Sequence, residues 1–160
     1  RSEIHELHAF FDVLRQCRNA NYYDLAIVLL LTGIRISEAA FLPSDIDFEK
    51  GILHIDKALQ YHCLKVKQFH FDTTKTLNSI REVALPEAAS EAIKRTIQRN
   101  KEFDAYMKKH PCPAFTHSES VFRTEYGSPI TSSTFRQILK RIEGKLLTLF
   151  FKYLLASLSK

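Results

Sequence analysis

An uninterrupted apolar segment that ends at a glycine constrains the fold of this chain more than any other feature. Leu25–Leu31 carries no polar side chain, and Thr32-Gly33 follows it directly. Such a run before a glycine is typical of a buried helix that stops where the backbone turns left-handed. We therefore predict a buried helix over Tyr22–Leu31. Arg35 then opens a second helical stretch on rigid structure, and its planar guanidinium suits a phosphate bound at two points.

Helical periodicity recurs on both sides of a short β-rich segment. Further helices are predicted around residues 4–14, at Ile36–Leu42 before Pro43, at Glu87–Lys109, and from Thr131 or Ser132 to Ile142, where Gly144 breaks the last one. Strands are predicted at Ile52–Ile55, Val66–Phe71 and Ser79–Leu85, with Thr73–Asn78 as a polar loop that carries Lys75. The order predicts an α+β fold, mostly helical, with a small three-stranded antiparallel sheet.

Charge and composition narrow the class of partner. With 160 residues, 45% of them hydrophobic, the chain is long and apolar enough for one globular domain. A net charge of +5 favours nucleic acid first and an anionic membrane surface second, and it also fits an ordinary basic surface. The three cysteines cannot all pair, which favours a reducing cytosol. The apolar runs are too short or too interrupted to span a bilayer, so no membrane partner is expected.

Three segments in a fixed order resemble one family. Thr32–Glu38, followed by Leu42 and Asp45-Ile46-Asp47, resembles the first catalytic block of tyrosine recombinases, the phage-integrase family. Thr74–Pro86 resembles the lysine-bearing β-hairpin of that family and its exit into a helix. Phe122–Phe135, with its Gly127-Ser128-Pro129-Ile130 turn, resembles the loop and helix that precede the His-x-x-Arg motif of the family.

The resemblance implies a function in site-specific recombination of a phage or other mobile element. A tyrosine would cleave one DNA strand, leaving a 3′-phosphotyrosyl link and a free 5′-hydroxyl, and rejoining would reverse the step without metal or cofactor. Arg35 would hold the non-bridging oxygens, and Lys75 would protonate the leaving 5′-oxygen. Glu38 would support the arginine segment through hydrogen bonds. Residues 1–160 would be a partial catalytic domain without the N-terminal core-binding domain of the family.

The implied partners are duplex DNA at recombination sites and further copies of the chain, which form a tetramer in the family. The implied location is the bacterial cytoplasm, at the nucleoid. Lys65, Lys67 and Lys75, interleaved with Phe69 and Phe71, would make a basic hairpin that faces DNA. Arg81 fits a strand surface charge and a phosphate contact equally well.

Ordinary structural roles also fit the same residues. Arg35 also fits a solvated charge, although a cation at a helix start opposes the helix dipole. Lys75 also fits a plain loop lysine. His110, Cys112 and His117 offer only three ligands for a zinc site, and a surface loop is the better interpretation.

The last segment departs from the family pattern. Aligned on Ala156-Ser157-Leu158, it has Leu149 at the motif histidine and Lys152 at the second arginine. Leucine cannot exchange a proton, lysine lacks the guanidinium fork, and Tyr153 does not fall at the nucleophile position. Whether the chain is an enzyme therefore stays open. The alternatives are a catalytically inactive DNA-binding or regulatory relic of the same fold, and a helical interaction domain with no nucleic-acid role.

Overall fold

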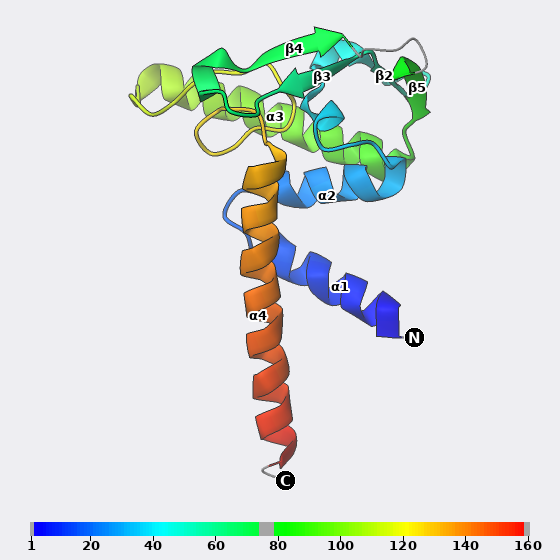
Figure 1. Ribbon diagram of the computed structural model, residues 1–160, viewed down its shortest axis with the longest axis vertical. Helices are drawn as coiled ribbons and strands as arrows, with labels where there is room; N and C mark the ends of the chain where they lie inside the picture. The colour runs from blue at the N-terminus through cyan, green and yellow to red at the C-terminus, as the bar shows by residue number, and fades with distance from the viewer. Residues whose placement is uncertain (1, 74–78, 159–160) are drawn as a thin grey trace.

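The computed structural model describes the backbone of residues 2–73 and 79–158 and the side chains of residues 4–73 and 79–146. Over this range the chain forms α-helices and two small antiparallel sheets, which confirms the predicted α+β class (Figure 1). The α-helices are α1 (Ser2–Arg15), α2 (Asn21–Thr32), α3 (Glu87–Lys109) and α4 (Ser132–Leu158). The strands are β1 (Ile46–Asp47), β2 (Ile52–Ile55), β3 (Lys57–Gln60), β4 (His70–Thr73) and β5 (Arg81–Ala84).

The apolar segment forms the buried helix that was predicted. Leu25 and Val28 of α2 are completely buried in the main core. Gly33 ends α2 with a left-handed backbone at φ 67°, and its N–H donates to the Leu29 carbonyl. A side chain at this φ would be strained, so the glycine fixes where the helix stops and where the segment of Arg35 begins.

Helices α2 and α3 pack against each other around one buried carboxylate. Asp24 on α2 is 1% exposed and accepts hydrogen bonds from Arg95, at 2.7 Å, and from Arg99 on α3. Ala89 and Ala92 of α3 are completely buried beside it, since small side chains let the helices approach closely. The pair of helices is the platform on which the sheets lie.

The three-stranded sheet has the predicted size and a different membership. Its order is β1-β2-β5, all antiparallel, with Ile52 opposite Ala84 and Ile55 opposite Arg81. The prediction of a strand over Val66–Phe71 is correct only for His70 and Phe71, which lie in β4. Val66–Gln68 is a 3-10 turn, because the Lys65 N–H donates to the Gln68 side chain and the Gln68 N–H donates to the Lys65 carbonyl.

The second sheet is a hairpin, and its strand β3 was not predicted from the sequence. Strand β4 pairs with β3 rather than with β2, and Gln60 lies opposite His70. A small core of Ala40, Leu59 and Tyr61 holds this hairpin against the turn that follows Arg35, with Phe69 and Phe71 packed around it. We call strands β3 and β4 and the loop between them, residues 57–73, the β3–β4 hairpin.

Two helix predictions also need correction. Of Ile36–Leu42, only Glu38–Ala40 is helical, as a single 3-10 turn, because Phe41 and Leu42 are extended, at ψ 158°, and the residue before a proline avoids the helical region. Helix α4 does not break at Gly144 but continues to Leu158. Glycine costs only about 1 kcal/mol inside a helix, and the residues with left-handed backbone do not include Gly144.

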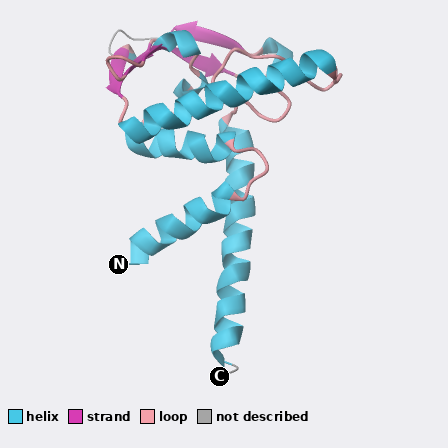
Figure 2. Cartoon of the chain, turned by 180° about the vertical axis from the view of Figure 1, so that it is seen from behind, coloured by secondary structure: helices cyan, strands magenta, loops and turns pink. Residues whose placement is uncertain are grey.

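Helix α4 runs away from the sheets. In Figures 1 and 2 both chain ends lie on the side of the molecule opposite the strands, and α1 packs beside α4. Within the described residues, no helix is long and apolar enough to cross a membrane.

Candidate active site

Arg35 lies in the short irregular segment between α2 and the 3-10 turn at Glu38–Ala40. Its side chain is exposed. Among the described residues, nothing forms a hydrogen bond or an ion pair with its guanidinium. The fork of Arg35 therefore projects from a fixed backbone and is open to a ligand from solution.

Glu38 fixes that backbone. Its side chain is 3% exposed, and its carboxylate accepts the Arg35 N–H at 2.8 Å. It also accepts both terminal nitrogens of Arg81, each at 2.9 Å, in a bidentate pair. Each carboxylate oxygen thus has a charged donor, which is the arrangement that a buried carboxylate needs. We call this three-residue contact the Glu38 brace.

The brace shifts the protonation equilibria of both partners. The hydrogen bonds from Arg81 lower the pKa of Glu38, against the opposing effect of burial, and the Arg35 N–H and the charges of both arginines act in the same direction as Arg81. The bond to Glu38 in turn raises the pKa of Arg81. The carboxylate is therefore held ionised, and it keeps compensating charge beside Arg35.

Arg81 joins this site to the segment of Lys75. Arg81 is the first residue of β5, and β4 ends at Thr73. Lys75 lies outside the described residues, between β4 and β5 in the sequence. Through Arg81, the start of β5 is tied to the Arg35 segment across 43 positions of sequence. The sequence showed both residues and gave no sign that they pair.

Lys65 and Lys67 lie at the tip of the β3–β4 hairpin, and both are exposed. The base of the hairpin is held by an ion pair that the sequence analysis missed. Lys57 Nζ lies 2.6 Å from Asp45 Oδ1, while Asp45 Oδ2 accepts the Leu42 N–H at 2.8 Å. Burial alone would lower the pKa of Lys57. The hydrogen bond to Asp45 and the negative charge of Asp45 outweigh this effect, so the pKa of Lys57 is raised. The position of Asp45 just after Pro43 is a helix-capping signal that sequence reading could have used.

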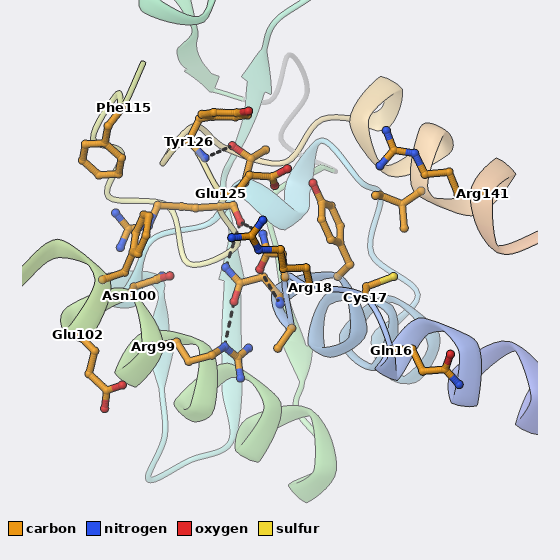
Figure 3. Close-up of a pocket in the computed structure, with 18 of the residues that line it drawn as sticks. Gln16, Cys17, Arg18, Arg99, Asn100, Glu102, Phe115, Glu125, Tyr126 and Arg141 are labelled. Carbon is orange, nitrogen blue, oxygen red and sulfur yellow. Dashed lines mark hydrogen bonds between the residues drawn. The ribbon is translucent and has the colours of Figure 1, made fainter. Parts of the chain in front are cut away.

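A cavity of about 1050 Å³ lies elsewhere, at the other end of α2 (Figure 3). Tyr22, Glu125 and Arg141 are among its lining residues, and Arg35 and Glu38 are not. Burial raises the pKa of Tyr22, and the neighbouring Glu125 adds to the rise. The candidate active site around Arg35 therefore lies apart from this cavity.

The histidine and cysteine residues form no metal centre within the described part of the chain. His117 Nε2 lies 3.5 Å from Asp104, whose carboxylate is already bound by the buried Arg123. Cys112 is exposed. This segment is a surface loop braced by Arg123.

Comparison with known proteins assigns the chain to a family. Residues 1–147 match the model of the phage integrase family. The chain is 30% identical over 131 residues to the transposases from transposon Tn916 of Enterococcus faecalis and transposon Tn1545 of Streptococcus pneumoniae. Each match covers 77% of this chain and 29% of the relative, so the chain spans less than a third of their length.

Solved structures show the same fold. The Tn1549 transposon integrase in complex with transposon right end DNA has a TM-score of 0.69 at 20% identity, over 89% of this chain and 43% of that one. XerA recombinase has a TM-score of 0.57 at 15% identity, over 88% of this chain and 41% of that one. The fold is therefore that of the tyrosine-recombinase catalytic domain, as the sequence predicted.

Proposed function

We propose that this chain, which belongs to the phage integrase family, acts in site-specific DNA recombination of a mobile element. The observation that carries the proposal is the open guanidinium of Arg35 on a backbone fixed by the buried Glu38. A rigidly mounted fork whose guanidinium has no hydrogen bond or ion pair to any described residue is suited to the non-bridging oxygens of a phosphodiester.

The chemistry proposed is transesterification through a 3′-phosphotyrosyl link. A tyrosine attacks the phosphorus, the bond to the 5′-oxygen breaks, and Lys75 gives that oxygen a proton. Arg35 stabilises the negative charge that builds up on the non-bridging oxygens in the transition state. The reaction is balanced without redox change, and rejoining runs the same steps in reverse.

Duplex DNA is the proposed partner, with copies of the chain assembled on it as a tetramer in the bacterial nucleoid. Lys65 and Lys67 are exposed cations on the β3–β4 hairpin, whose strand β4 ends two residues before Lys75 in the sequence. Arg81 is proposed as a weaker phosphate contact, since its two terminal nitrogens already bind Glu38.

An inactive DNA-binding relic of the same fold is the second candidate. Helix α4 runs without interruption through residues 149 and 152, where the sequence has Leu149 and Lys152 in place of a histidine and an arginine. Lysine at that position retains a charge for phosphate and loses the bidentate geometry. This candidate keeps the role of Arg35 in binding and removes the covalent step.

The two candidates are separated by one substrate. We expect the chain to bind duplex DNA with an affinity that falls steeply with salt, and Arg35→Ala to reduce the affinity about three- to tenfold. Lys108→Ala, at the far end of α3, is the charge-matched control and should change little. A nicked suicide duplex, offered to the full-length gene product, then tests for a covalent adduct: trapping supports the recombinase, and binding without trapping supports the relic. Failure to bind duplex DNA contradicts both.

A further inference from the structure

Tyr61 connects two parts of the chain that are distant in sequence. Its buried hydroxyl group donates to Ser132 Oγ at 2.6 Å, across 71 positions. Tyr61 directly follows β3, and Ser132 is the first residue of α4. The bond therefore fixes the β3–β4 hairpin to the start of α4.

Two contacts hold the hairpin tip to Tyr61. The Leu64 N–H donates to the Tyr61 carbonyl at 3.2 Å, and the Phe69 ring meets the Tyr61 ring edge-on with centroids 6.2 Å apart. Lys65 and Lys67 lie between these two contacts in sequence. The position of Tyr61 thus sets the position of both lysines.

The row of α4 that begins at this contact is basic. Residues 132, 136 and 140 are four apart, so they lie one above another on one face of the helix. Ser132 on that face contacts the hairpin, and the next two members, Arg136 and Lys140, are exposed. Over the described side chains, neither Arg136 nor Lys140 forms an ion pair, and the same holds for Lys65 and Lys67.

We propose that Tyr61 is a positioning residue that joins the hairpin tip and this row of α4 into one basic surface for the phosphates of duplex DNA. The inference rests on the proposed function, because duplex DNA is its ligand. Two cationic groups that move independently each lose conformational entropy when DNA binds. Groups that are already joined lose it during folding, so DNA binding costs less. The hairpin and α4 should therefore contribute to affinity as a unit.

A mutant cycle tests this unit, with duplex binding measured at one fixed salt concentration. Lys67→Ala on the hairpin and Arg136→Ala on α4 are combined in the wild-type chain and again in Tyr61→Phe. In the wild type, the double variant should lose about threefold less affinity than the product of the two single losses, because either change already disrupts joint contact. In Tyr61→Phe the two losses should multiply.

Three further single variants test whether the hydrogen bond between Tyr61 and Ser132 is the cause of the coupling. Tyr61→Phe alone should weaken binding about threefold, the size expected for losing one hydrogen bond. Ser132→Ala removes the same bond from the other side and should reproduce that loss, with no further loss in the double variant. Tyr106→Phe, an exposed tyrosine on α3, is the matched control and should bind like the wild type.

The outcomes separate this inference from the function on which it rests. If the wild-type chain fails to bind duplex DNA, the proposed function fails. If it binds and the losses from Lys67→Ala and Arg136→Ala multiply in the wild type, the function stands and the positioning role of Tyr61 is wrong. Coupling that persists unchanged in both Tyr61→Phe and Ser132→Ala also overturns it.

Discussion

The Arg35 segment and the β3–β4 hairpin are held to the body of the protein in different ways. The Arg35 segment is held by a buried carboxylate that accepts three hydrogen bonds, two of them from a guanidinium. The hairpin is held by three buried side chains, one hydroxyl bond and an ion pair at its base. Removing one charge from the Glu38 brace leaves the other charges uncompensated. The β3–β4 hairpin, in contrast, can lose one of its contacts and keep the others. The residue proposed for catalysis is thus fixed more strictly than the residues proposed for DNA contact.

The largest effect is expected from Glu38→Ala. It leaves the Arg35 N–H and the Arg81 fork without their partner, so the free energy of unfolding should fall by about 2–4 kcal/mol. Urea denaturation followed by circular dichroism measures it. Glu82, the next residue along β5, has an exposed carboxylate and serves as the control. The free energy of unfolding of Glu82→Ala should stay within about 0.5 kcal/mol of the wild-type value. Equal losses for the two variants would contradict the contrast between the brace and the surface.

A smaller loss is expected from Arg81→Gln, because its side chain is 39% exposed and water replaces part of the lost contact. We expect about 1–2 kcal/mol after allowing for solvent screening. Arg81→Lys keeps the charge and loses the fork, so it should recover only part of that stability. Full recovery by lysine would mean that charge alone, rather than bidentate geometry, holds β5 to Glu38.

The pH dependence of stability gives a further test of the brace. The pKa of Glu38 is lowered in the folded chain, so its contribution is present above the unfolded value of about 4.3 and is lost as pH falls below it. Melting temperatures measured from pH 6 down to pH 3 should fall less steeply in Glu38→Gln than in the wild type. Parallel curves would show that this carboxylate does not contribute to acid unfolding.

The smallest effect on stability is expected at the hairpin tip. Lys65→Ala combined with Lys67→Ala should change the free energy of unfolding by less than about 0.5 kcal/mol, since both side chains are exposed. The same variant should reduce the salt slope of duplex binding by about 0.9 for each lost phosphate contact. An unchanged slope, measured by fluorescence anisotropy across a salt series, would remove these lysines from the DNA surface.

Local patterns were enough to predict α2 and α3. Their periodicity is strong, Gly33 gives a stop with a physical cause, and Pro86 precedes the start of α3. Strand β3 could not be predicted in the same way, because Lys-Ala-Leu-Gln has no strand preference of its own. It becomes a strand because Leu59 packs on Ala40 and because β4 lies beside it.

In the candidate site, too, local features could be predicted and contacts between distant residues could not. Arg35 and Glu38 were found because they are three residues apart in a recognisable segment. Their link to Arg81 was not found, since a pairing across 43 positions leaves no trace in one sequence. Helix α4 shows the opposite error, in which Gly144 was given more weight than one glycine has against a long helical segment.

The contact between α2 and α3 contains an ambiguity of register. Arg95 and Arg99 are one helical turn apart and both bind Asp24, so sliding α3 by a turn would place an arginine on the same carboxylate again. The charges alone therefore cannot tell the two alignments apart. The small residues can: the same slide would bring Ile93 to the completely buried place of Ala89, and Thr96 to that of Ala92. Two alanines, rather than the ion pairs of Asp24, thus decide how the platform beneath the Arg35 segment is aligned.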